Sequence, residues 1–130
     1  GFQMCNVPDN LKYTTSHEWI KDLCNGKFKI GITDYAQGEL GDIIFIEFPD
    51  TGDKFNAGDS IGTIEAVKTV ADLFTPLTGE ISEINLKLED EPEAINKDPY
   101  ESGWIIKLKN ILEEGKPQLL TASEYKKYIN

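Results

Sequence analysis

The chain has 130 residues, and its 23 acidic side chains outnumber 13 basic ones, which gives a formal net charge of −10. This length is typical of one domain, and a hydrophobic fraction of 39% is enough for a core, so a disordered chain is excluded. The negative charge excludes nucleic acid and anionic membrane surfaces as expected partners, because both would repel it. The longest apolar run, residues 43–46, is far shorter than a membrane span.

Short strands separated by turns dominate the sequence. Each predicted strand alternates polar with apolar residues or is rich in β-branched and aromatic ones. The predicted strands cover residues 27–30, 42–48, 61–67, 81–88 and 104–108. Clusters of Gly, Pro, Asn, Asp and Thr mark turns at 49–52, 56–59 and 75–79. This spacing favours a mainly β sandwich or barrel over β-α-β units.

Helices are predicted to be few and short. Residues 34–37 have the pattern of a capping box and predict a helix that begins at Asp34 and ends near Gly41. A stronger capping box at 121–124 predicts a C-terminal helix, because a hydroxyl and a carboxylate three residues apart satisfy each other's free amides. The acidic stretch 89–101 contains two prolines and is predicted as a solvated loop with one helical turn.

The domain prediction is a flexible N-terminal segment over residues 1–10 followed by one domain over 11–130. Residues 1–3 are interpreted as left over from cloning, and the first ten residues lack the basic start and apolar stretch of a signal peptide. Cys5 and Cys24 are too few for a disulfide framework and are expected as reduced thiols. These features favour the bacterial cytoplasm, with the mitochondrial matrix as the alternative.

Signatures of catalysis are missing from the sequence. His17 is the only histidine, no C-x-x-C pair is present, and neither a nucleotide-binding glycine loop nor a nucleophile elbow occurs. Carboxylates are so numerous that pairs of them say nothing about an active site. A triad built on His17 stays open, although a lone histidine is more often structural. The residues alone therefore make this a poor candidate for an enzyme, with no metal site.

Lys68 has a symmetric setting. Turn glycines lie 10 residues before it, at Gly58, and 11 residues after it, at Gly79. Two strands of similar length therefore meet beside Lys68, and a hairpin so arranged would hold its ammonium at the outermost point of a sheet. Such a lysine is suited to covalent modification, because the new group would project into solvent. The spacing alone favours an ordinary surface lysine at a loop tip.

The residues around Lys68 carry a family resemblance. Segments 65–72 and 75–81 resemble the lipoyl-lysine hairpin of the glycine cleavage system H proteins, with Ala66 and Ala71 where that family usually has serine. Further blocks are similar to the family in its order along most of the chain, at residues 11–13, 16–19, 31–37, 40–43 and 96–104.

The resemblance implies a fold and a function. The fold would be a barrel-sandwich hybrid of the lipoyl- and biotinyl-carrier kind, mainly β with a few short helices. Lipoate would be attached to Lys68 as an amide, and Ser16, Glu18 and Asp72 would contact the aminomethyl-bearing arm. The chain would be a non-catalytic shuttle of the glycine cleavage system rather than an enzyme. It would carry the aminomethyl group from glycine decarboxylase to the tetrahydrofolate-dependent aminomethyltransferase.

The resemblance also implies further partners. The dithiol left after aminomethyl transfer would go to dihydrolipoamide dehydrogenase. The lipoyl group itself would come from a lipoate ligase or a lipoyl/octanoyl transferase. Three of these partners are the P, T and L proteins of the system, namely the decarboxylase, the aminomethyltransferase and the dehydrogenase.

Related carriers and other functions form the alternatives. Biotin carriers place Met on both sides of the modified lysine, where this chain has Val67 and Thr69. Lipoyl domains of 2-oxo acid dehydrogenases lack the blocks at 16–19 and 103–104. Two other functions stay open, namely an unmodified β-sandwich interaction module and an H-like protein that passes acyl groups on in lipoate metabolism.

Overall fold

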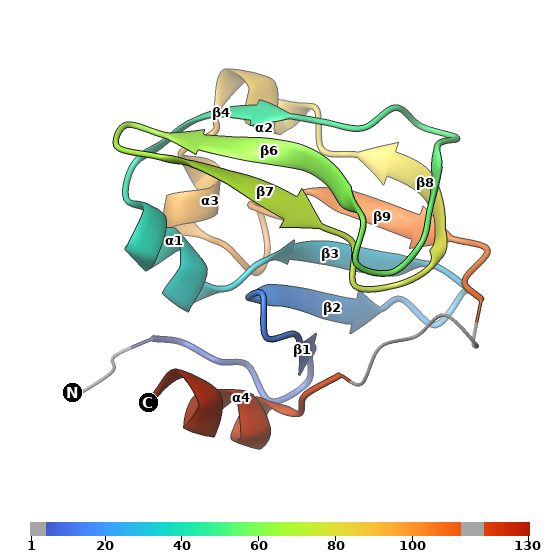
Figure 1. Ribbon diagram of the computed structural model, residues 1–130, viewed down its shortest axis with the longest axis horizontal. Coiled ribbons are helices and arrows are strands. Elements are labelled where there is room, and N and C mark those ends of the chain that lie inside the picture. Colours follow the sequence, from blue (N-terminus) through green and yellow to red (C-terminus); the bar gives the residue numbers. More distant parts are fainter. Residues whose placement is uncertain (1–4, 113–118) are drawn as a thin grey trace.

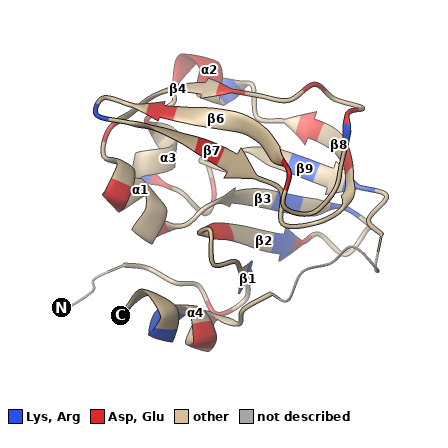
Figure 2. Ribbon diagram, in the orientation of Figure 1, with Lys and Arg blue, Asp and Glu red and all other residues tan. Residues whose placement is uncertain are grey.

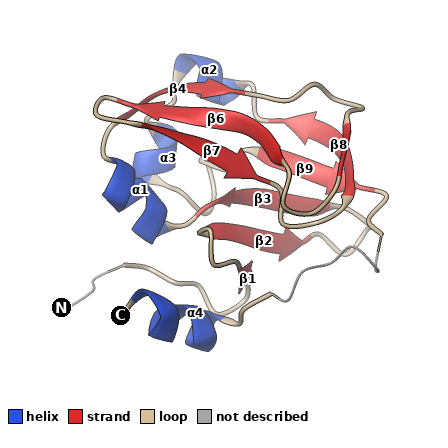
Figure 3. Cartoon of the chain, in the orientation of Figure 1, coloured by secondary structure: helices blue, strands red, loops and turns tan. Residues whose placement is uncertain are grey.

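Two antiparallel sheets form the body of the chain in the computed structural model, which describes residues 5–112 and 119–130 (Figures 1 and 3). The larger sheet has the strand order β1-β2-β3-β9-β8-β5, and the smaller one has the order β4-β6-β7. The strands are β1 (Lys12–Tyr13), β2 (Glu18–Asp22), β3 (Phe28–Ile32), β4 (Ile43–Glu47), β5 (Lys54–Phe55), β6 (Ser60–Ala66), β7 (Val70–Phe74), β8 (Gly79–Ile84) and β9 (Ile106–Lys109). The helices are α1 (Asp34–Leu40), α2 (Lys87–Asp90), α3 (Ala94–Lys97) and α4 (Ala122–Ile129).

The main core lies between the two sheets. Alternate side chains of the strands point inward, so Ile30 and Ile106 of the larger sheet belong to the same buried cluster as Ile64 and Leu73 of the smaller one. Each of these four side chains is at most 1% exposed. Burying such a side chain stabilises the fold by roughly 1.5–3 kcal/mol relative to leaving it in water. This cluster holds the β6–β7 pair, and therefore its turn, in a fixed place over the larger sheet.

A second, aromatic cluster covers the outer face of the larger sheet. Tyr13 of β1 stacks on Tyr125 of α4, with ring centroids 4.8 Å apart, and both rings are fully buried. Trp19 of β2 lies directly over Gly31 of β3, where a Cβ atom would come within 2.6 Å of the indole ring. Only glycine leaves room for that ring. Helix α4 is fixed in turn by the Thr121 capping box that the sequence predicts.

Most predicted elements are present, and two predictions were wrong in detail. Helix α1 is capped by Thr33, whose hydroxyl accepts from the Ala36 amide, rather than by Asp34. The predicted loop at 89–101 has its one helical turn in α3, as expected, and its first two residues belong to the end of α2. The predicted strand 81–88 ends at Ile84, four residues early, because the next residue turns the chain: the Asn85 side chain donates to the backbone carbonyls of Ser102 and Trp104.

The described part of the N-terminal segment contacts the rest of the chain. Val7 is buried, the amide of Asn6 donates to the carboxylate of Asp34, and the Tyr13 hydroxyl donates to the carbonyl of Pro8 at 2.5 Å. Residues 1–3, interpreted as a cloning remnant, lie outside the described residues, and the boundary at residue 11 stays a prediction. No helix in the described ranges is both long and apolar enough to cross a membrane.

Candidate functional site

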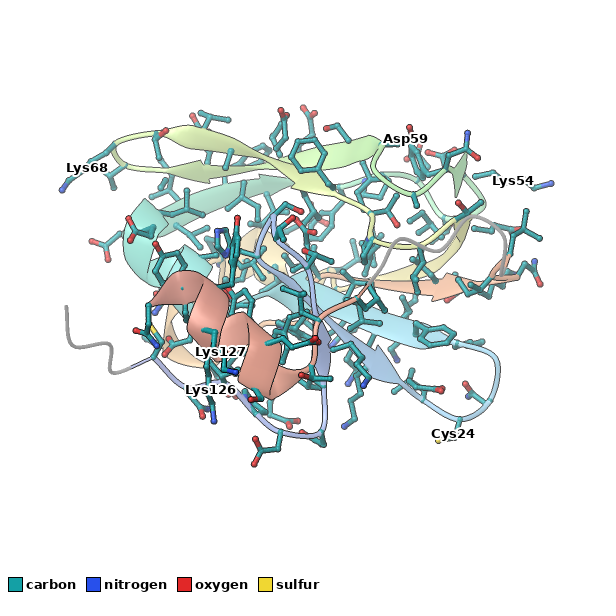
Figure 4. The ribbon with its side chains drawn as sticks, turned by 60° about the horizontal axis from the view of Figure 1, so that its bottom comes forward. Cys24, Lys54, Asp59, Lys68, Lys126 and Lys127 are labelled. Atoms are coloured by element: carbon teal, nitrogen blue, oxygen red, sulfur yellow. The ribbon has the colours of Figure 1, made fainter. Side chains whose placement is uncertain are left out.

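Lys68 lies at the outer tip of the hairpin that β6 and β7 form. The strands pair in register up to Glu65 and Val70, and the amide of Ala66 donates to the carbonyl of Thr69 at 2.8 Å to close the turn. Figure 4 shows the Lys68 side chain projecting from this tip, at the opposite end of the molecule from Lys54. Lys68 is exposed and makes no ion pair with any residue in the described ranges. Its ammonium is therefore accessible to another protein.

Glu18 is a buried carboxylate at the start of β2. Its side chain is 2% exposed, and one oxygen, Oε1, accepts hydrogen bonds from Thr14 Oγ1 at 2.6 Å and Ser16 Oγ at 2.7 Å. The other oxygen, Oε2, accepts no hydrogen bond from the described residues. Burial raises the pKa of Glu18 above its ordinary value, and the two hydroxyl donors oppose that rise. No buried side-chain oxygen of the described residues lacks a hydrogen-bond partner, so Oε2 keeps some solvent exposure and is open to an incoming cation.

Ser16 and Glu18 line one wall of a cleft of about 310 Å³. The other wall is the underside of the β6–β7 pair, from which Ile64 and Ala71 contribute apolar surface. The complete lining is Ser16, His17, Glu18, Ile32, Tyr35, Ala36, Glu39, Leu40, Ile64, Ala71 and Asp72. An apolar interior with carboxylates at its margin suits a flexible hydrocarbon chain that ends in a cation.

Asp72 reaches the same cleft from the opposite sheet. It lies on β7, an edge strand, and its exposed carboxylate has only a long contact with Ser60 Oγ, at 3.5 Å, among the described residues. Of the three predicted contact residues, the structure therefore joins Ser16 and Glu18 by a direct hydrogen bond. It brings Asp72 to the cleft without a contact to either.

His17 has a structural role at the edge of this cleft. Its backbone adopts a left-handed conformation with φ 71°, and its Nδ1 atom lies 2.7 Å from the hydroxyl of Tyr125 in α4. That hydroxyl also lies 2.8 Å from Thr33 Oγ1. Burial lowers the pKa of His17, against the attraction of the Glu39 carboxylate, so the imidazole is neutral and can accept from the Tyr125 hydroxyl. Helix α4 thereby fixes the turn that carries Ser16 and Glu18.

Comparison with known proteins decides the family. The model of the family described as glycine cleavage H-protein matches residues 11–130, which is nearly the whole chain. The chain belongs to the glycine cleavage H-protein family. The resemblance read from the hairpin blocks is thereby confirmed, and membership gives the chain a role in the glycine cleavage system.

Relatives named glycine cleavage system H protein match the chain over almost their full lengths. The relative from Listeria monocytogenes serotype 4a is 49% identical over 125 residues, covering 96% of this chain and 99% of its own. The Chromohalobacter salexigens relative is 52% identical over 122 residues, covering 94% and 93%. A crystal structure of the H protein from Mycobacterium marinum is 38% identical, with a TM-score of 0.85 and coverage of 93% and 97%. The mainly β lipoyl-carrier fold is thus confirmed for this member of the H-protein family.

Three residues of the cleft region were missed in the sequence. Tyr35 and Glu39 line the cleft from α1, where their spacing of four places them on one helix face. Tyr125 positions His17 from 108 residues away, a contact that no local pattern reveals. In this H-protein family member, the cleft therefore combines the 16–18 segment, β3 with α1, the β6–β7 pair and, through His17, helix α4.

Proposed function

We propose that Lys68 carries a lipoyl group in amide linkage and that this chain is the non-catalytic shuttle of the glycine cleavage system. One observation carries the proposal: an exposed Lys68, without an ion pair among the described residues, lies at the tip of a hairpin whose underside forms a wall of the cleft that Glu18 lines. An amide there would remove one positive charge and change the formal net charge from −10 to −11. When bound, the lipoyl disulfide supplies an acceptor for the aminomethyl group of glycine and afterwards a dithiol that is reoxidised.

The side chains of the cleft fit such a group. Ile32, Leu40 and Ile64 offer apolar surface for the hydrocarbon part of the arm. Glu18 lines the cleft with its Oε1 atom held by Ser16, and its Oε2 atom, which has no hydrogen-bond donor among the described residues, would accept from a terminal ammonium. Asp72 adds a second negative charge from the facing strand. These residues hold and shelter the cargo, and none of them is required to move a proton.

The proposed partners are the enzymes whose chemistry completes this cycle. They are glycine decarboxylase, the aminomethyltransferase, dihydrolipoamide dehydrogenase and an enzyme that attaches lipoate. Tethering raises the effective concentration of the cargo at each docked partner. The bacterial origin of the relatives supports a bacterial cytoplasmic location as part of this proposal.

Glycine-dependent exchange of labelled CO2 with purified glycine decarboxylase tests the proposal. The lipoylated wild-type chain should support exchange, and Lys68→Arg should not, because Arg keeps the charge but offers no amine that can be acylated. Lys54→Arg is the matched control, since Lys54 is an exposed lysine at the opposite end of the molecule (Figure 4). Exchange that survives in Lys68→Arg would contradict the proposed attachment site.

A further inference from the structure

Four large apolar side chains are exposed at the end of the molecule that carries Lys68. Ile44 and Phe45 are 52% and 53% exposed, and Val67 and Val70 are 67% and 59% exposed. We call these four residues the hairpin patch. Contiguous exposed apolar surface is unusual unless it binds something, because it contributes nothing to the core and favours aggregation.

An irregularity in β4 creates half of this patch. In a regular strand, neighbouring side chains point to opposite faces, so only one of two consecutive residues would face solvent. The pairing of β4 with β6 shifts register between Ile43 and Phe45. As a result, Ile44 and Phe45 are both exposed, whereas Ile43 and Ile46 on either side are buried. Bulges of this kind commonly re-aim side chains next to functional sites.

Strand pairing places the rest of the patch beside the first half. Phe45 of β4 is the partner of Glu65 in β6, and Glu65 is the partner of Val70 in β7, so these three side chains form a row on the outer face of the smaller sheet. The amide of Val67 donates to the carbonyl of Asp42 at 3.0 Å, which joins the hairpin tip to the start of β4. The patch is therefore one surface immediately next to Lys68.

We propose that the hairpin patch is the docking surface for the enzyme that acylates Lys68, and this inference rests on the proposed function. The enzymes of glycine cleavage would act on the sulfur atoms at the far end of the arm, many bonds away from Lys68 Nζ. An acylating enzyme must instead bring its activated acyl carbon within bonding distance of Lys68 Nζ. Its surface must then lie on Val67 and the side chains adjoining it.

The charge around the patch defines the chemistry of the partner. Asp42, Glu47 and Asp72 are exposed, and the partly exposed Glu65 lies within the patch, between Phe45 and Val70. The patch is therefore apolar with acidic groups both at its margin and inside it. In Figure 2, red acidic segments on α1, β6 and β7 lie near the blue tip of the hairpin. The complementary surface is an apolar hollow with a rim of Lys or Arg side chains.

We take an acyl adenylate as the donor of the acyl group that is transferred to Lys68. The neutral amine of Lys68 forms a bond from Nζ to the acyl carbon, and the bond from that carbon to the phosphate oxygen breaks. AMP leaves with the electron pair of that bond, and the nitrogen loses one proton to solvent. The patch takes no part in these bond changes and acts only by positioning Nζ.

Acylation rates of the unmodified full chain test the proposal. A purified lipoate–protein ligase is supplied with ATP and octanoate, and octanoylation is followed by intact mass. Truncating an interface anchor commonly costs tenfold or more, so we expect Phe45→Ser to lower kcat/KM by about tenfold. Leu112→Ser is the matched control: Leu112 is 56% exposed and lines a hollow with Lys54, far from Lys68 (Figure 4).

Two further measurements test whether a lower rate has another cause, namely loss of stability or lower reactivity of Lys68. The thermal unfolding midpoint should be the same for Phe45→Ser and wild type, because the side chain is outside the core. Acetylation of Lys68 by a small N-hydroxysuccinimide ester should also be equal, since that reagent needs no docking surface.

The outcomes are distinct. Equal enzymatic rates for Phe45→Ser and Leu112→Ser would overturn the docking proposal while leaving the proposed function intact. Normal acylation of Phe45→Ser combined with impaired reaction with glycine decarboxylase would overturn it too, and would assign the patch to that enzyme. A wild-type chain that is not acylated at Lys68 at all would overturn both the docking proposal and the proposed function.

Discussion

Replacing Glu18 by Gln removes one charge from the cleft while keeping the shape of the side chain. In the wild type, Oε1 accepts from both hydroxyl donors, and Oε2 accepts from none of the described residues, so Oε2 is the atom that would bind the ammonium of the proposed aminomethyl-bearing arm. A charge-assisted hydrogen bond to a buried carboxylate contributes roughly 1.5–3 kcal/mol. Because 1.4 kcal/mol corresponds to about a tenfold change in an equilibrium constant, Glu18→Gln should free the arm about tenfold to a hundredfold more often.

The lifetime of the loaded protein measures this release. Wild type and Glu18→Gln are loaded with the aminomethyl group, separated from the decarboxylase, and followed by intact mass as the group is lost to water. We expect the loaded variant to decay faster, whereas its lipoylation and its reoxidation as a dithiol should be unchanged. Glu39→Gln is the matched control, because Glu39 also lines the cleft but is exposed. Equal lifetimes for wild type and Glu18→Gln would refute the sheltering role.

The pH dependence of the same lifetime gives a second check on Glu18. Burial raises its pKa above the ordinary value of 4.5, and only the ionised carboxylate attracts the ammonium. Retention should therefore be complete above the raised pKa and be lost as the pH falls through it, while Glu18→Gln shows no such step. The stability of the unloaded chain depends on pH in the opposite direction. The folded chain binds this proton more tightly, so the free energy of unfolding of unloaded wild type should fall relative to Glu18→Gln as the pH rises above 4.5.

Four further predictions follow from the fold and the charge. Lys68→Arg should change the free energy of unfolding by less than about 0.5 kcal/mol in urea, because the tip is exposed; a larger loss would mean that the tip is packed. Gly31→Ala should destabilise by about 1–3 kcal/mol, since the new methyl group would displace Trp19, and an unchanged urea midpoint would contradict this packing. Tyr125→Phe should lower the free energy of unfolding by about 1–3 kcal/mol, because His17 loses its hydroxyl partner. An unchanged free energy of unfolding would contradict the role of α4 in fixing the turn before Glu18. Stopped-flow association with partner enzymes should slow between 0.1 and 1 M salt, where the Debye length falls from about 10 to 3 Å; rates independent of salt would exclude electrostatic steering.

The parts of the fold that could be predicted from the sequence are those specified locally. The β6–β7 hairpin lies between turn residues, and α4 begins at a capping box, so both follow from neighbouring residues. Strand β2 was missed because Trp19 and Ile20 are both buried, one on each face of the larger sheet. A strand covered on both faces lacks the alternation that reveals a half-buried one.

The site likewise has residues that the sequence could identify and features that depend on tertiary packing. The family resemblance led to Lys68, Ser16, Glu18 and Asp72, but no pattern shows that Glu18 is buried with one oxygen satisfied and the other available. That state depends on where β6 and β7 lie over β2, which is a matter of tertiary packing. The contact of Tyr125 with the turn before Glu18 is equally non-local.

The intact mass and peptide map of protein produced in lipoate-competent cells would show whether Lys68 carries a lipoyl group. We predict that wild type is heavier by one lipoyl group, that the modified peptide contains Lys68, and that Lys68→Arg has the unmodified mass. A wild-type chain of unmodified mass under these conditions, or a lipoyl group mapped to another lysine such as Lys54 or Lys87, would contradict it.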